Sequence, residues 1–241
     1  MERRKFLKTS ATLGLIIAFP KILLSKPIQN LPNVLILGDS ISIGYTPFVK
    51  EMLAGKANVY RPTLENGQPE NCEGTTKGVR NMERWLTNSG SGNSFHQWDI
   101  IHFNFGLHDL KHVDPVTGEN SKNRKDPLQA DLKQYKKNLK TLVEMLKSSG
   151  ARLIFATTTT YPDDVEGVLR DAGMPLKYNR AAIKIMNRQS IVINDLYNFM
   201  LPRMNELQLP KNVHFKPEGY KELAGKVVER IDEIIRDLNS K

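Results

Sequence analysis

Two short segments near opposite ends of the sequence carry the side chains best suited to nucleophilic chemistry. Ser40 closes the Gly-Asp-Ser turn 38–40 directly after the apolar run 34–37, and His214 lies in segment 212–217, which ends in a proline that can start a helix. A serine hydroxyl becomes a strong nucleophile when an imidazole within hydrogen-bond reach accepts its proton. The sequence therefore predicts a Ser40–His214 pair that attacks a carbonyl carbon.

The turn itself offers further contributions to such a site. Gly38 permits a tight backbone turn, and the Asp39 carboxylate can accept hydrogen bonds from neighbouring amides. The backbone amide of Ser40 can stabilise a developing oxyanion. The competing interpretation is an ordinary turn with Ser42 as a second hydroxyl, since Gly, Asp and Ser are common turn residues.

These two segments together resemble a known family. The turn 38–40 and segment 213–220 (Val-His-Phe-Lys-Pro-Glu-Gly-Tyr) look like the first and last motif blocks of SGNH/GDSL hydrolases, and the resemblance covers most of residues 33–228. It implies a serine esterase that works through an acyl-enzyme, without a cofactor, on an acylated small molecule, glycan or lipid. Deacylation of a carbohydrate is the preferred expectation.

The third motif block of that family, Gly-x-Asn-Asp, falls on residues 106–109, where His108 replaces the asparagine. The resemblance assigns this position to the oxyanion, and an imidazole N–H could replace the amide donor. Asp109 is a candidate supporting residue beside it. The alternative for His108 is a histidine satisfied by local backbone groups.

The glycine of the second block, a backbone donor to the oxyanion in the family, is best matched by Gly74 in segment 71–76. Gly67 and Gly78 lie nearby, and Asn71 could offer its side-chain amide instead. The sequence leaves these alternatives open, with Gly74 as the leading candidate.

The family's Asp-x-x-His pattern would place an acid at position 211, but this chain has Lys211 there. Asn212 or Asp195 could orient the imidazole of His214 instead, although an aspartate at position 195 can also cap the following helix. A backbone carbonyl could also orient the imidazole, which would leave a Ser–His dyad. The missing acid also motivates the hypothesis of a catalytically impaired glycan-binding protein on the same fold. That is the first alternative function.

A metal-dependent hydrolase is the second alternative, because His102, His108, Asp109 and His112 fall within eleven residues. Their spacing matches no zinc motif, so no metal is predicted. Cys72 is the single cysteine of the chain and cannot form an intramolecular disulfide. It is expected to line a wall near the oxyanion segment rather than to act as the nucleophile.

The rest of the domain alternates between strand and helix patterns. Short apolar runs at 34–37, 100–103, 153–156 and 191–193, with a weaker candidate at 57–60, predict strands buried on both faces. Helices are expected near 46–55, 77–88, 127–148 and 217–238, with an exposed loop at 118–127. This alternation predicts a three-layer, doubly wound (flavodoxin-like) α/β domain with a parallel sheet of about five strands, whose carboxyl ends meet the ligand.

Residues 1–30 differ from the globular domain expected at 31–241. Arg3, Arg4 and Lys5 precede an apolar run at 11–19, a pattern typical of an export signal and similar to the twin-arginine type. The run is about half as long as a membrane-spanning helix requires. The predicted location is therefore periplasmic or extracellular, with the export machinery as partner and membrane tethering if the signal stays uncleaved.

The charge of the chain is unevenly divided. Residues 1–30 hold six cations and one anion, a net of +5 out of the formal +9, so the domain carries +4. The sequence shows no basic helix with interleaved aromatic residues, and +4 spread over a domain of this size is small. No nucleic-acid partner is predicted.

Overall fold

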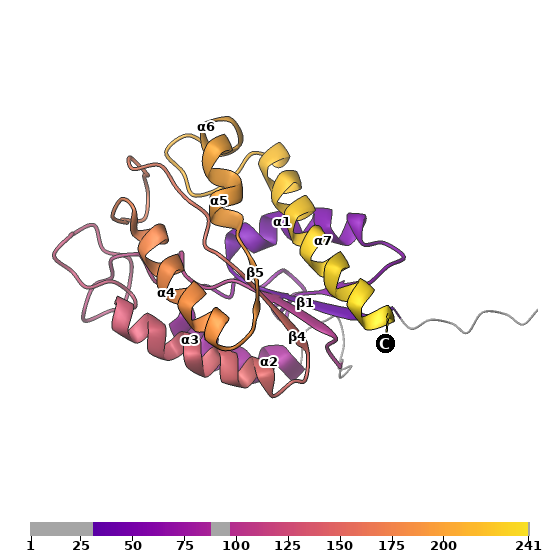
Figure 1. Cartoon of the computed structure of the whole chain (residues 1–241). Helices are drawn as coiled ribbons and strands as arrows, with labels where there is room; N and C mark the ends of the chain where they lie inside the picture. Colours follow the sequence, from indigo (N-terminus) through magenta and orange to yellow (C-terminus); the bar gives the residue numbers. More distant parts are fainter. Residues whose placement is uncertain (1–30, 88–96, 241) are drawn as a thin grey trace, which may run out of the picture. The chain divides into compact units, whose positions relative to one another are not determined.

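One parallel sheet organises the domain. The structure is a computed structural model that describes residues 31–87 and 97–240 (Figure 1). The strand order is β2-β1-β3-β4-β5, with β1 (Asn33–Leu37), β2 (Asn58–Tyr60), β3 (Ile100–Phe103), β4 (Arg152–Ala156) and β5 (Val192–Asn194). This is the flavodoxin-like order, and it confirms the expected doubly wound fold. The predicted export signal, residues 1–30, lies outside the described residues.

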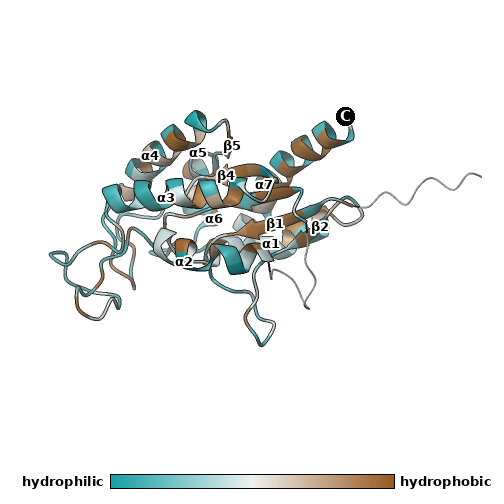
Figure 2. Ribbon diagram, turned by 90° about the horizontal axis from the view of Figure 1, so that it is seen from below, coloured by the Kyte–Doolittle hydropathy of each residue, from teal (hydrophilic) through white to brown (hydrophobic). Residues whose placement is uncertain are grey.

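Helices cover both faces of the sheet (Figure 1). One face carries α1 (Ser40–Met52), α5 (Leu196–Met200) and α7 (Pro217–Asn239), and the other carries α2 (Thr75–Thr87), α3 (Leu132–Lys147) and α4 (Met174–Arg188). The short η1 (Leu201–Arg203) and α6 (Met204–Leu207) lead from α5 towards α7. In Figure 2 hydrophobic residues follow β1, while α3 and α4 alternate between hydrophobic and hydrophilic residues, because each buries only one face.

Several helices differ from the predicted ones. The helix expected from residue 46 already begins at Ser40, because the Asp39 side chain accepts a hydrogen bond from the Ile41 amide at 2.9 Å and caps it. The helix expected from residue 127 begins only at Leu132, after the capping residue Asp131. The whole of α4 was not predicted.

The loops that follow the strands build the site. β1 leads into the turn 38–40, β2 into the loop 61–74, β3 into the long connection 104–131, and β4 into the segment 157–173. All of these begin at the carboxyl edge of the sheet, where doubly wound domains bind ligands. None of the described helices is long and apolar enough to span a membrane.

Candidate active site

Ser40 is the first residue of α1, immediately beyond the end of β1. A Cβ at position 38 would lie 3.0 Å from the Ser42 hydroxyl, so Gly38 allows the helix to start this close to the strand. Ser42 is buried, and its hydroxyl donates to the Asp39 backbone carbonyl at 2.7 Å. Ser42 therefore stabilises the first turn of α1, while Ser40 is only half-buried and faces the loops.

His214 lies directly beside that serine. Its Nε2 atom is 2.9 Å from the Ser40 hydroxyl oxygen. Its Nδ1 atom is 2.9 Å from the side-chain oxygen of Asn212, which also accepts the His214 backbone N–H at 3.0 Å. An amide oxygen can only accept, so it selects the ring form with the proton on Nδ1 and the lone pair on Nε2. That form can take a proton from Ser40.

The other candidates for orienting the imidazole have different contacts. Asp195 caps α5: its carboxylate accepts from the Asn198 amide at 3.2 Å and from the Thr157 hydroxyl at 3.0 Å. Lys211 has a positive φ of 51°, and its ammonium pairs with Glu166 at 2.8 Å. Of the candidates that the sequence offered for orienting His214, Asn212 is the one whose side chain contacts the imidazole.

Two contacts that the sequence did not reveal hold the His214 loop. The buried side chain of Gln208 donates to the carbonyl oxygens of Thr160 at 2.9 Å and Val213 at 3.0 Å. Tyr220 of α7 packs over Gly44 of α1, where a Cβ would lie 2.2 Å from the ring. These contacts fix the loop relative to the helix that begins with Ser40.

The second and third motif blocks meet at the amino end of α2. The Asp109 carboxylate accepts hydrogen bonds from the Thr75 amide at 3.0 Å and from its hydroxyl at 2.5 Å. A Cβ at Gly74 would lie 3.0 Å from that carboxylate. Of the alternatives, Gly67 lies in an exposed turn, and Gly78 is a buried residue of α2 that faces Phe105 and Leu142. Gly74 is therefore the glycine beside the third block, and burial raises the pKa of Asp109 to about 7.

His108 lies next to Asp109 in the turn after β3. Its Nδ1 atom is buried and has no hydrogen-bond partner among the described residues. Burial lowers the pKa of His108 to about 4, and the charges of Lys111 and Arg170 act in the same direction. The imidazole is therefore neutral at pH 7. A neutral imidazole carries one N–H and can therefore donate one hydrogen bond.

Arg170 is a site residue that the sequence did not reveal, because segment 157–173 carries no recognisable motif. The side chain is largely buried, and its Nε donates to the Leu107 carbonyl oxygen at 3.0 Å. Burial, and then the positive charge of Arg170, lower the pKa of His214. The same charge acts on His108 and on the buried carboxyl of Asp39, whose pKa burial raises to about 6. Arg170 therefore influences both histidines of the site.

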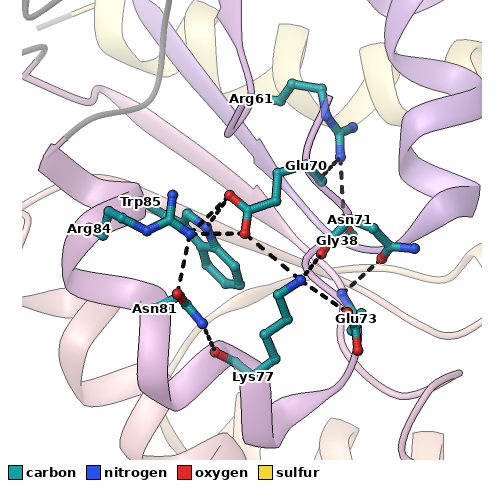
Figure 3. Close-up of polar contacts among 9 residues, drawn as sticks. All are labelled: Gly38, Arg61, Glu70, Asn71, Glu73, Lys77, Asn81, Arg84 and Trp85. Carbon is teal, nitrogen blue, oxygen red and sulfur yellow. Dashed lines mark hydrogen bonds and ion pairs between the residues drawn. The ribbon is translucent and has the colours of Figure 1, made fainter. Parts of the chain in front are cut away.

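A network of polar groups around the buried side chains of Arg61 and Glu70 fastens the loop that carries Gly74 (Figure 3). Glu70 accepts hydrogen bonds from Arg84 at 2.9 Å and from the Trp85 indole at 3.0 Å. Arg61 donates to the backbone carbonyl oxygens of Glu70 at 3.0 Å and Gly38 at 3.5 Å, which ties this loop to the serine turn.

Asn71 belongs to the same network, and it shapes the loop (Figure 3). Its side-chain oxygen accepts from the Glu73 amide at 2.9 Å, and its backbone carbonyl accepts from Lys77 at 2.8 Å. Glu73, just before Gly74, has a positive φ of 56° that this turn holds in place.

The residues weighed as metal ligands do not converge. His102 contacts Asn194, while His112 contacts the Asp126 carbonyl and the Asp171 carboxylate. Within residues 31–87 and 97–240, no group of three His, Cys, Asp or Glu side chains is arranged to hold a metal ion. Cys72 is fully buried, and burial raises the pKa of its thiol to about 12, so the thiolate needed for attack does not form at neutral pH.

Comparison with known proteins places the chain in a family. It matches the GDSL-like lipase/acylhydrolase family over residues 36–222. It is similar in structure to a lipase/acylhydrolase from Enterococcus faecalis (18% identity, TM-score 0.63, 83% of this chain and 95% of that one). It is also similar to the acetyl xylan esterase AlAXEase (15% identity, TM-score 0.62, 83% and 99%). A G-D-S-L family lipolytic protein from Veillonella parvula is a third such structure (18% identity, TM-score 0.56, 82% and 96%).

No curated protein matches the sequence. The family match extends over most of the domain, and the solved structures share its fold. The chain therefore belongs to the GDSL-like lipase/acylhydrolase family, and the expected enzyme class, a serine esterase of the SGNH type, is confirmed.

Proposed function

We propose that this protein is an exported esterase that removes acyl groups from carbohydrates, with Ser40 as nucleophile, His214 as general base and Asn212 as the residue that orients it. One observation carries the mechanism. The Ser40 hydroxyl, the imidazole and the Asn212 side-chain oxygen form a continuous hydrogen-bonded chain with two distances of 2.9 Å. Such a chain is the geometric requirement for an activated serine.

In the first half of the reaction, His214 Nε2 takes the Ser40 proton while the serine oxygen bonds to the ester carbonyl carbon. The tetrahedral intermediate collapses, the imidazolium gives its proton to the leaving sugar oxygen, and the acyl group stays on Ser40. In the second half, His214 takes a proton from water, the hydroxide attacks the acyl carbon, and the proton returns to Ser40. The products are a carboxylic acid and a free sugar hydroxyl.

The oxyanion is stabilised by the backbone amides of Ser40 and Gly74 and by the neutral imidazole of His108. Donors already held in position stabilise developing charge without having to reorganise. Support for this assignment comes from the Asp109–Thr75 contact, which holds Gly74 beside the third block. Asp109 and Asn71 act as positioning residues.

The substrate class and the location rest on two observations. One structural neighbour is named an acetyl xylan esterase, and residues 1–30 carry the export-signal pattern. An enzyme exported by the twin-arginine or a related route would meet acylated glycans of the cell envelope or of the surroundings, and its location would be periplasmic or extracellular.

The experiment compares the wild-type chain with Ser40→Ala. We expect a fluorophosphonate probe to label the wild-type protein and not the variant, and acetate to be released from acetylated xylan only by the wild type. Lack of labelling at every pH from 5 to 9 would instead favour the glycan-binding alternative. Loss of activity with a chelator and its recovery with a divalent ion would favour the metal-dependent alternative.

A further inference from the structure

Two rows of cations face each other across the groove between α3 and α4, which lie side by side on one face of the sheet (Figure 1). α3 contributes Lys133, Lys136, Lys137 and Lys140. These positions are three and four residues apart, so they share one side of the helix. The groove between the helices has a volume of about 750 Å³.

The other wall repeats this arrangement. α4 contributes Lys177, Arg180, Lys184 and Arg188, again at helical spacing. From the first to the last of these residues the row extends roughly 16 Å, at 1.5 Å per residue. The lining contains no acidic and no aromatic residue.

The eight cations are exposed and unpaired. None of them forms an ion pair with any residue that the structure describes, although eleven ion pairs occur elsewhere in that part of the chain. Like charges three and four residues apart destabilise a helix, and a field of one sign destabilises the compact state. Repulsion among these cations therefore lowers the stability of the folded domain, and a bound polyanion would neutralise that repulsion.

The charge is also concentrated here rather than spread. The domain carries +4 in total, so the residues outside this groove carry a net of −4. The net charge of +4 is thus not spread evenly over the domain, as the sequence suggested, because this groove holds eight of its cations.

The shape and lining of the groove indicate which class of polyanion it can bind. Neighbouring helices pack with their axes about 8–10 Å apart, so the groove that runs along their contact is narrow and suits a single extended chain lying on it. Single-stranded nucleic acids are bound by aromatic residues that stack on bases, and this lining has none. Helices that insert into a membrane surface carry bulky apolar side chains beside their cations, whereas the apolar lining here is limited to Leu132, Ala181 and Ile185.

We propose that the α3–α4 groove binds an extended anionic polysaccharide through its carboxylate groups. The choice of a polysaccharide among linear polyanions rests on the proposed function. Both helices begin after connections that start at the carboxyl edge of the sheet, so the Lys133 and Lys177 end of the groove lies towards the side of the domain that carries Ser40. The groove thereby holds the polymer near the edge where its ester groups are cleaved.

The test measures binding of the full chain to unacylated polygalacturonate, which offers carboxylates but no ester to cleave. Neutral dextran, phosphatidylglycerol vesicles and single-stranded DNA serve as comparison ligands. We expect binding to polygalacturonate that weakens as salt is added, and no binding to dextran. Tighter binding to the vesicles or to the DNA than to polygalacturonate would overturn the proposal.

A groove variant and a matched control decide whether this surface is responsible. The groove variant reverses four charges: Lys136→Glu, Lys140→Glu, Arg180→Glu and Lys184→Glu. The control makes the same net change at exposed positions elsewhere: Lys50→Glu, Lys122→Glu, Lys125→Glu and Lys221→Glu. We expect the groove variant to bind at least about tenfold more weakly and the control to keep most of its affinity. Equal losses in the two variants would mean that only net charge matters, and would overturn the proposal.

Hydrolysis of p-nitrophenyl acetate by the same proteins separates this inference from the proposed function. We expect the groove variant to retain this activity, since a small uncharged ester does not need the groove. Polymer binding without any esterase activity would refute the proposed function and leave the groove in place. Esterase activity without polymer binding would refute the groove alone.

Discussion

The two sides of the site depart from the family pattern in different ways. On the base side, Ser40, His214 and Asn212 are linked by direct side-chain hydrogen bonds, and His214 is half-buried. On the proposed oxyanion side, the fully buried carboxylate of Asp109 accepts from the Thr75 amide beside Gly74, and burial keeps the imidazole of His108 neutral.

The two sides accommodate their departures from the family pattern, Lys211 for an acid and His108 for an asparagine, by different physical means. The base side loses the carboxylate at position 211 and gains an acceptor from the next residue, Asn212, through a turn within the same loop. The oxyanion side exchanges an amide for His108, and burial keeps the imidazole neutral. On the first side, a local hydrogen bond from Asn212 replaces the missing carboxylate. On the second side, burial keeps the replacing histidine, His108, uncharged.

The largest effect should come from removing the proposed nucleophile or the proposed base. We expect Ser40→Ala or His214→Ala to lower kcat on p-nitrophenyl acetate about 10⁴- to 10⁶-fold, because these residues act as one unit. The double variant should lose no more than either single variant. Additive losses would show that the two side chains do not act as a pair.

The oxyanion side should show a smaller loss that depends on the donor. We expect His108→Ala to lower kcat about 10²- to 10³-fold with little change in KM. His108→Asn restores an N–H donor and should retain activity within about tenfold of the wild type. An Asn variant as inactive as Ser40→Ala would give His108 a different role.

The orienting residue should matter less than either of these. We expect Asn212→Ala to lower kcat about 10- to 100-fold, since the imidazole loses the acceptor that selects its productive form. Asn212→Asp keeps the acceptor and adds a negative charge, which raises the pKa of His214. Its kcat/KM profile should therefore rise at a higher pH than that of the wild type. An unchanged kcat in Asn212→Ala would show that another group orients His214.

The smallest effect concerns the pH profile. Burial and the Arg170 charge lower the pKa of His214, so the neutral base persists to a lower pH than usual. The rate should thus rise with pH at a midpoint below the usual value of about 6.5. We expect Arg170→Gln to move this midpoint upward, because a positive charge that lowers the pKa of His214 is removed, and Arg170→Lys to restore it. The thermal unfolding midpoint of each variant controls for loss of structure.

Local sequence patterns determined much of this protein. The four short runs, apolar except for His102, all became strands of one parallel sheet, because a strand covered on both faces is largely apolar. Ser40 could be located because a Gly-Asp-Ser turn after such a strand places its last residue at the carboxyl edge. Helix α4 (Met174–Arg188) escaped prediction because its capping position is Gly173, which offers no side-chain capping bond.

Tertiary structure alone decided the remaining questions. Asn212 and Asp195 were both candidates in the sequence. The structure shows that the Asp195 carboxylate accepts from Thr157 after β4 as well as capping α5, while Asn212 contacts the imidazole of His214. Arg170 influences His214 across a long sequence separation that no local pattern records. Each row of cations on α3 and α4 looks by itself like a solvated helix face. They form one groove only because the two helices pack side by side, and charge acts through space rather than along the chain.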